Sequence, residues 1–410
     1  MSTRSQASET ATSQTAKIGV GLPVWALAGC YVAAQAATLV LSPILVAVAD
    51  DFGVSVSVAG QLRSVSGAVA GAGALAVGLV VARFGHRSVL LGGLVTLAVA
   101  SGLSAIAPTF VALSGAQILL GLSIVLVQAT AIAGVTVWIT RGARAQALSW
   151  ILPGAAFAWI VGMPIVGVVG AVSWRLAWLT VPLAVSLPVI ALVWRLPPRP
   201  HAQRSRSGHL RRTLRNPNVA GWAFGELCAY SATAGFVVYL GALMIESYGV
   251  SLTTAGLVLG LAMIAYLPGS LLFRRWIDTD SRALLIGLGL AGALTAALLG
   301  AVRPSLAVTA LLTALFLFVN AGRTISSSAF GLDAAPDRAT TTMGILTSTR
   351  HFGYLVGGVA GGVALTLGGY TALGLTFAAL YVLGTVPHVF RAFRYARSSP
   401  SHSTGGTPHG

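Results

Sequence analysis

The stretch "GLVVARFGHRSVLLGG", residues 78–93, decides how this sequence folds. Two long apolar segments are joined here by residues 83–87, most of which are glycine, arginine or histidine. In a soluble protein such a segment is a surface turn between helices. The composition of the whole chain excludes a soluble protein and places this turn at the surface of a membrane.

Composition alone assigns the chain to the membrane proteins. Of its 410 residues 56% are hydrophobic and only 8% are charged, and the mean hydropathy is +0.85. A soluble domain has about 25% charged residues, so this chain cannot cover a surface that faces water. Its polar groups must instead flank a body that faces lipid.

Twelve apolar stretches are long enough to cross a membrane, because about 20 residues in a helix span the hydrocarbon layer. They are residues 22–49, 58–82, 88–107, 109–139, 145–170, 176–194, 218–244, 253–273, 283–302, 306–330, 340–367 and 371–390. None alternates apolar and polar residues as a membrane strand does. We therefore predict an all-α integral membrane protein with twelve transmembrane helices.

The basic residues predict how these helices are oriented. If the N-terminus lies in the cytoplasm, all but five of the 25 lysines and arginines fall in tails or cytoplasmic loops, as the positive-inside rule requires. We expect a multi-pass protein of the cell membrane with both termini in the cytoplasm. The net charge of +16 then meets the anionic inner leaflet, and no nucleic acid is needed as a partner. The five exceptions are Arg63, Arg175, Arg303, Arg323 and Arg350.

A short internal echo indicates that the chain is a duplication. "FGVSVSVAG" (residues 52–60) follows the first apolar stretch and "YGVSLTTAG" (residues 248–256) follows the seventh, and five of the nine positions are identical. The echo predicts two six-helix bundles related by a parallel internal repeat. In each copy a turn glycine precedes Ser57 or Thr253, which we expect to be the N-cap of the next helix.

A polar, arginine-rich segment, residues 195–218, separates the two sets of six stretches. Residues 1–18 are rich in serine, threonine and alanine and lack the apolar core of a signal peptide. The sequence therefore predicts five parts. They are a disordered cytoplasmic tail (1–18), an N-terminal six-helix bundle (19–195), a cytoplasmic linker (196–216), a C-terminal six-helix bundle (217–390) and a second cytoplasmic tail (391–410).

Two six-helix halves joined by a basic loop resemble the major facilitator superfamily. Residues 78–87 resemble that family's loop pattern G-x-x-x-D-R-x-G-R-R: Gly78, Arg83, Gly85 and Arg87 match, and Ala82 replaces the aspartate. The resemblance implies a gating loop without its carboxylate. Its glycines permit a tight turn, and its arginines can bind carbonyls at helix C-termini. The alternative is an anchor that only sets orientation.

The fifth apolar stretch points to one group within that family. "GMPIVG", followed by Trp174 and Arg175, resembles the G-x-P-x-x-G … WR pattern of drug and sugar efflux members. Gly162, Pro164 and Gly167 would form a hinge where helices approach closely, the alternative being a proline kink at an ordinary interface. In the fourth stretch Gln117 stands where family members often carry arginine.

Glu226 is the only acidic residue deep in a predicted helix. It lies nine residues into that helix, about 13 Å along at 1.5 Å per residue, near the midplane of a layer about 30 Å thick. An ionised carboxylate there costs at least a few kcal/mol unless it faces water or a cation. We predict that Glu226 binds the coupling proton, and the alternative is a fixed ion pair, for example with Arg350.

Polar residues recur on one side of several helices, and the resemblance implies that the first, fourth, seventh and tenth helices line a central cavity. The predicted cavity residues are Tyr31, Gln35, Gln117, Gln128, Glu226, Tyr230, Asn320, Arg323 and Arg350. For a single serine or threonine, a hydrogen bond between helices explains the pattern equally well. No metal-ligand spacing is present, and His351 is expected to be a hydrogen-bonded core residue.

These features predict a secondary active transporter that moves a small organic molecule by alternating access, most simply proton-coupled efflux of drugs or metabolites. The chain has no nucleotide-binding GxxxxGK[ST] loop and no metalloenzyme motif, so we predict no cofactor and no enzymatic activity. Its partners would be the substrate, a proton or other coupling ion, and membrane lipid, with the protein a monomer. The alternatives are an uptake carrier for a small organic anion or metabolite, a non-transporting membrane sensor, or a polytopic membrane enzyme.

Overall fold

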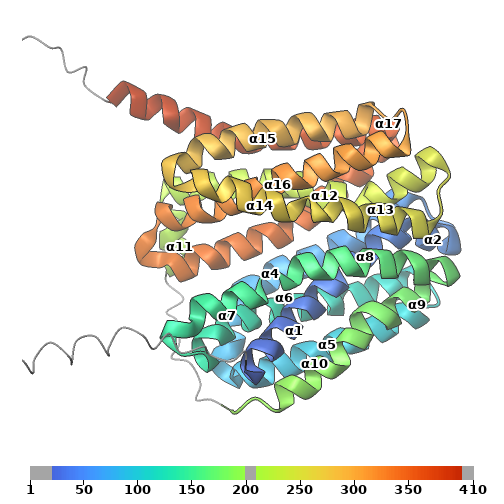
Figure 1. Cartoon of the computed structure of the whole chain (residues 1–410), viewed down its shortest axis with the longest axis horizontal. Helices are drawn as coiled ribbons and strands as arrows, with labels where there is room; N and C mark the ends of the chain where they lie inside the picture. Colours follow the sequence, from blue (N-terminus) through green and yellow to red (C-terminus); the bar gives the residue numbers. More distant parts are fainter. Residues whose placement is uncertain (1–20, 199–208, 399–410) are drawn as a thin grey trace, which may run out of the picture.

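The computed structural model describes residues 21–198 and 209–398, which contain helices, turns and loops but no strand. Figure 1 shows two helical bundles lying side by side, one blue to green and the other yellow to red. The first bundle contains α1 (Leu22–Leu39), α2 (Leu41–Phe52), α3 (Val56–Ala59), α4 (Gln61–Phe84), α5 (His86–Ile106), α6 (Phe110–Trp138), α7 (Arg144–Ile151), α8 (Gly154–Val172), α9 (Trp174–Trp178) and α10 (Ala184–Trp194).

The second bundle has fewer and longer helices. It contains α11 (His209–Leu214), α12 (Pro217–Tyr248), α13 (Leu252–Ile264), α14 (Tyr266–Phe273), α15 (Ile277–Ala301), α16 (Leu306–Ala334) and α17 (Ala339–Ser398). In the described ranges eleven helical segments, some of them pairs of consecutive helices, are long and apolar enough to cross a membrane. This confirms the predicted all-α integral membrane fold.

The last of these segments, Thr341–Val389, crosses twice. It has 49 residues, which as a straight helix would measure about 74 Å at 1.5 Å per residue, far more than a bilayer. Gly368 and Gly369 interrupt it with non-helical backbone, and Gly369 has a φ of +61° that favours glycine. The eleven segments therefore make twelve crossings, as the hydropathy pattern predicts.

The internal echo has the same backbone geometry in both copies. Gly53 and Gly249 end α2 and α12 with φ of +62° and +65°. The expected N-caps were wrong by two residues, because Ser55 and Ser251 accept the capping bonds, from the amides of Val58 and Thr254. A helix begins where its first amides find an acceptor, and these earlier serines supply it. The repeat itself is consistent with the structure.

Parts of the predicted division fall on residues that the structure does not describe. The tail 1–18, the last residues of the second tail and the middle of the linker lie outside the described ranges. Within the linker, α11 is helical, and α17 continues past the predicted boundary at residue 390 to Ser398. We keep the division into two six-helix bundles joined by a linker as a proposal.

The two bundles pack against each other mainly through three helix pairs: α2 with α12, α4 with α17, and α8 with α13. The glycines on these helices explain the close approach. A Cβ at Gly67 of α4 would lie 2.9 Å from the carbonyl oxygen of His351 in α17, and one at Gly256 of α13 would lie 2.6 Å from that of Met163 in α8. Backbone therefore meets backbone along the seam.

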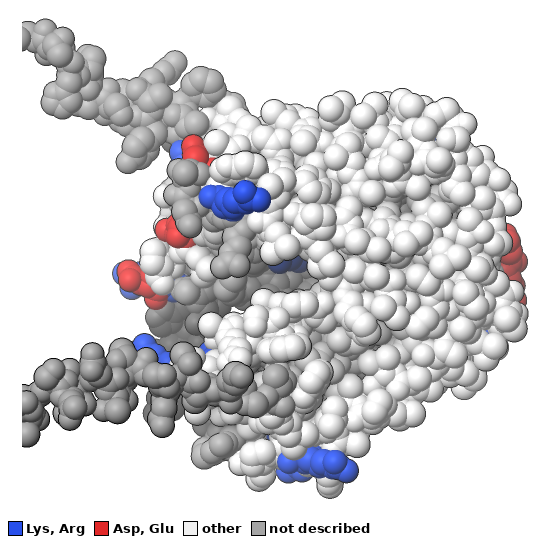
Figure 2. Space-filling view, in the orientation of Figure 1, with Lys and Arg blue, Asp and Glu red and all other residues white. Residues whose placement is uncertain are grey.

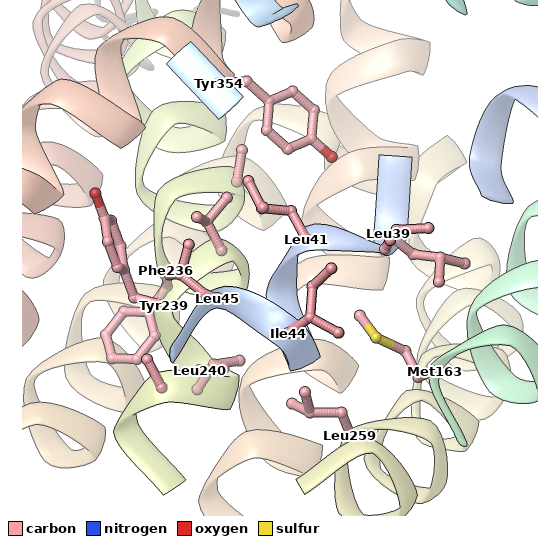
Figure 3. Close-up of a cluster of buried hydrophobic side chains, with 14 of the residues drawn as sticks. Leu39, Leu41, Ile44, Leu45, Met163, Phe236, Tyr239, Leu240, Leu259 and Tyr354 are labelled. Atoms are coloured by element: carbon pink, nitrogen blue, oxygen red, sulfur yellow. The ribbon is translucent and has the colours of Figure 1, made fainter. Parts of the chain in front are cut away.

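A hydrophobic core fills the end of the molecule where the bundles meet. Figure 3 shows that α1 and α2 project into it between α12 on one side and α8 and α13 on the other. The labelled members are Leu39, Leu41, Ile44, Leu45, Met163, Phe236, Tyr239, Leu240, Leu259 and Tyr354. Because this core belongs to both bundles, it closes that end of the molecule to water.

Candidate functional site

Opposite this closed end the molecule is hollowed between its bundles, as Figure 2 shows. Several polar and aromatic side chains of helices from both bundles are half-buried: Tyr31, Gln35, Gln128, Trp159, Tyr230, Tyr266 and Arg350. In a dry core these side chains would be fully buried. A tyrosine or arginine that is only half-buried deep in a helix bundle indicates contact with water. These residues define the candidate site.

Glu226 of α12 forms the centre of a buried ion-pair cluster. Its Oε2 accepts a hydrogen bond of 2.7 Å from Nη1 of Arg323 and another of 2.7 Å from Oγ of Ser327, both on α16. Its Oε1 accepts one of 2.9 Å from Nε of Arg350 on α17. The structure therefore joins three of the predicted site residues. The pair with Arg350 is the one that the sequence offered as an alternative to proton binding.

Arg350 is the member of this cluster that faces the hollow. Its Nη2 donates to the Thr324 carbonyl at 3.2 Å and to Oγ of Ser328 at 3.1 Å, which orients the guanidinium. Its side chain is 24% exposed, against 3% for Arg323 and 1% for Glu226. One cation therefore lies at the wall of the hollow and the other lies behind it.

Arg323 points away from the hollow, into the second bundle. Its Nε and Nη2 are buried and have no hydrogen-bond partner among the described residues. A small cavity of about 10 Å³ adjoins it, which is about the room that the centre of one water molecule needs. The cavity is lined by Gly225, Glu226, Ala229, Leu285, Gly289, Arg323, Ser327, Tyr381, Gly384, Thr385 and His388.

Gln35, another predicted site residue, is oriented by a neighbour that the sequence analysis did not single out. Trp159 of α8 donates from Nε1 to Oε1 of Gln35 at 3.0 Å. Tyr31, one helical turn earlier on the same face of α1, is half-buried, and so is Gln128 of α6. That this face of the first helix borders the hollow stays a prediction.

Gln117 and Asn320 lie inside the bundles instead. Gln117 is 1% exposed and lies 3.4 Å from Oγ of Ser104 in α5. Asn320, also 1% exposed, accepts from Oγ1 of Thr233 at 2.7 Å and from the hydroxyl of Tyr381 at 2.6 Å. Spacing along a helix places residues on one face, but it does not say which neighbour that face meets.

The predicted gating loop is a tight turn between α4 and α5. Gly85 has a φ of +80°, and its amide donates to the Val81 carbonyl. Arg87 donates from Nη2 to the carbonyl of Trp194, the last residue of α10, at 2.5 Å, so one loop arginine does bind a helix C-terminus as expected. Arg83 is exposed, and within the described residues its guanidinium lies near the Phe84 ring, while Gly78 has open space around it.

The predicted hinge residues lie at contacts of α8. Gly162 faces Leu39 of α1, which belongs to the same bundle. Gly167 crosses Gly256 of α13, and Pro164 packs on Gly260, so both contact the other bundle. Pro164 lies within α8 without ending it. These residues allow the two bundles to touch.

Four residues in or beside the candidate site were not among the predicted site residues: Arg63, Trp159, Tyr266 and Tyr354. Arg63 is buried in α4 with its guanidinium carbon 3.9 Å from the Tyr354 ring centroid. Tyr266, the first residue of α14, lies beside Thr324. The sequence carries a signal for Arg63, because a basic residue within a predicted membrane helix is costly to bury. No group of His, Cys, Asp and Glu in the described part could hold a metal ion.

Comparison with known proteins identifies the fold. Three solved structures are similar at 14% sequence identity each. A D-xylose-proton symporter has a TM-score of 0.74, with 89% of this chain and 96% of that chain covered. A bacterial homologue of the human lysosomal transporter Spinster, inward-facing and unoccupied, has a TM-score of 0.71, with 92% of this chain and 98% of that chain covered. The nucleoside transporter NupG has a TM-score of 0.72, with the same two coverages, 92% and 98%. The sequence pattern of the family described as Major Facilitator Superfamily matches residues 27–242 and 222–409. With twelve crossings in two bundles and both halves of its sequence matched, this chain belongs to the Major Facilitator Superfamily and is a multi-pass membrane transporter.

Proposed function

We propose that this transporter exports a small organic molecule from the cell by alternating access, in exchange for protons. The observation that carries the proposal is the asymmetry between the two ends of the molecule. At one end α2, α8 and α4 pack on α12, α13 and α17, and at the other the bundles are separated by a hollow. Rocking of the bundles about the seam would close the hollow at one end and open it at the other.

The basic residues support an orientation in which the open end faces the cytoplasm. Arg83, Arg87, Arg141 and Arg144 all lie at or near helix ends on that side of the first bundle. Both termini then lie in the cytoplasm of a cell-membrane protein, and we propose that it works as a monomer surrounded by lipid. A substrate would enter from the cytoplasm in the described conformation.

Glu226 supports coupling to protons because two cations depend on it. A proton on its carboxyl group would remove the charge that holds both Arg323 and Arg350. Arg350, already at the wall of the hollow, could then turn toward a substrate. The alternative is that the cluster only ties α12, α16 and α17 together, and in that case its charge would never change during transport.

The test uses the purified protein in liposomes loaded with a pH-sensitive dye, to which a panel of drugs and metabolites is added. Substrates should move protons in the wild type and should lose that effect in Glu226→Gln while still exchanging across the membrane. Glu246→Gln is the matched control, because Glu246 is an exposed acid on the same helix that bonds Tyr370. Proton movement that persists in Glu226→Gln would remove Glu226 from the coupling mechanism.

A second candidate is an uptake carrier for a small organic anion. It is favoured by the three arginines, Arg63, Arg323 and Arg350, that accompany a single acid inside the described membrane helices. The direction of movement in cells separates the two candidates. A strain that lacks the gene should accumulate an exported compound and should fail to accumulate an imported one.

A further inference from the structure

The charges inside the membrane do not balance. Among the described residues of the membrane helices, Arg63 and Arg323 are buried and Arg350 is partly buried, but Glu226 is the only buried acid. Arg323 and Arg350 share this one carboxylate. Because an uncompensated charge in a membrane interior costs at least a few kcal/mol, the site is built to receive negative charge.

Arg63 is the cation that no acid accompanies. It is 3% exposed, its Nη1 lies 3.3 Å from Oγ of Ser66, and its Nε has no hydrogen-bond partner among the described residues. Its main neighbour is the face of Tyr354, which belongs to the other bundle. A cation–π contact attracts a guanidinium but does not neutralise it.

Two tyrosines connect Arg63 to Arg350. The rings of Tyr354 and Tyr230 meet edge to face, with centroids 5.9 Å apart at 80°. The guanidinium carbon of Arg350 lies 5.6 Å from the Tyr230 centroid. The order Arg63, Tyr354, Tyr230, Arg350 therefore runs from α4 of one bundle to α17 of the other, with a cation at each end and aromatic rings between.

Arg350 has a donor left for a ligand. Its Nε and Nη2 are used by Glu226, Thr324 and Ser328, but its Nη1 makes no hydrogen bond to any described residue and the side chain is partly exposed. Arg323 cannot play this part, because it lies behind Glu226. A carboxylate in the hollow would meet Arg350 first.

We propose that the substrate is an organic anion with a flat aromatic body, whose acidic group binds Arg350 while its ring lies against Tyr230. This inference rests on the proposed function, since it treats the hollow as the transport path. Arg63 adds long-range attraction from the other bundle, so the anion is drawn to a point between the bundles. An anionic ligand there would balance charge that the protein leaves unbalanced.

The test measures binding of three probes of one shape, naphthoate, naphthamide and naphthylmethylammonium, to the full chain in discs of phosphatidylcholine. Naphthoate should bind at least tenfold more tightly than the other two. Arg63→Gln should reduce that preference about tenfold, and Arg63→Lys should keep it. A loss of folded protein would lower binding of all three probes equally, so it would not change the ratio between them. Equal binding of the three, binding of none, or a preference for the amide or the amine would overturn the inference.

Two further arms separate the possible explanations. If adding phosphatidylglycerol to the discs abolishes naphthoate binding, the anion is a lipid headgroup and the substrate class is wrong. If naphthoate binds but no compound crosses the liposome membrane, the ligand class stands and the proposed transport fails. If a neutral or cationic compound is exchanged for protons while naphthoate does not bind, the proposed function stands and this inference fails.

Discussion

Gly167 of α8 and Gly256 of α13 cross with no side chain between them: a Cβ built at Gly167 would lie 3.0 Å from the Cα of Gly256 and 2.7 Å from the carbonyl oxygen of Leu252. Because one glycine belongs to each bundle, this crossing is part of the seam that closes one end of the molecule. Contacts this tight exist only when this end is closed, so they are specific to the conformation that the structure describes.

Replacing Gly256 with valine should therefore open the closed end. The added side chain would meet backbone of α8, which cannot move without separating the two helices. We expect a thiol placed at Gln35 to become accessible from the outer face of the membrane. Gly102→Val is the control, since Gly102 lies within α5 with open space around it, and equal accessibility in both variants would contradict the prediction.

Removing the charge of Glu226 should destabilise the protein more than removing that of Arg323. Glu226→Gln leaves the buried Arg323 and the partly buried Arg350 without an anion, whereas Arg323→Gln leaves Glu226 with Arg350 and Ser327. Breaking a buried pair typically costs about 3–5 kcal/mol, and we expect Glu226→Gln near that range and Arg323→Gln well below it. Thermal unfolding in detergent checks the order, and the reverse order would show that Arg350 contributes little.

The two loop arginines should differ in their effect on stability. Arg87→Ala removes a bond to the last carbonyl of α10 and a contact with the Trp194 ring, which we expect to cost about 1 kcal/mol, as for a typical hydrogen bond. Arg83→Ala removes only an exposed contact with Phe84 and should leave unfolding unchanged. Equal losses would mean that the loop acts through its charge alone.

Labelling should separate the hollow from the interior of the bundles. In a protein whose buried Cys30 and Cys228 are replaced by alanine, a cysteine at Gln35 should react with a water-soluble thiol reagent. A cysteine at Gln117 or Asn320 should not, because both positions are 1% exposed. Protection of position 35 from both sides of the membrane would remove the hollow, and the transport proposal with it.

The sequence predicts the twelve crossings well because each depends on local hydropathy, which the bilayer thickness converts directly into helix length. The duplication was also accessible, since a turn glycine such as Gly53 or Gly249 leaves a local signature. The N-caps were predicted wrongly because two serines lie in the same turn and either could cap the helix. Only the backbone geometry decides that Ser55, and not Ser57, accepts the bond.

The site was predictable only in part. The cost of burying charge singled out Glu226, and its pairing with Arg350 was one of two expected outcomes. The directions in which the Asn320 and Arg323 side chains point were not predictable. Helical spacing fixes the face on which a residue lies, but not the neighbouring helix that this face meets. The contact of Arg63 with Tyr354 joins residues nearly 300 positions apart, and nothing local in the sequence indicates it.

None of the three ion pairs among the described residues crosses the seam: Arg175 binds Asp51 within the first bundle, and the Glu226 pairs lie within the second. Apart from the buried contact of Arg63 with the Tyr354 ring, neutral side chains bonded to the opposite backbone cross it, such as Ser42 to the Val237 carbonyl at 2.6 Å and Ser348 to the Gly71 carbonyl at 2.8 Å. Dissolved ions weaken attractions between charges far more than bonds of this kind. The equilibrium between the form open to the cytoplasm and the form open to the outside should therefore not depend on ionic strength. The carrier should then keep working in a cell under osmotic shock.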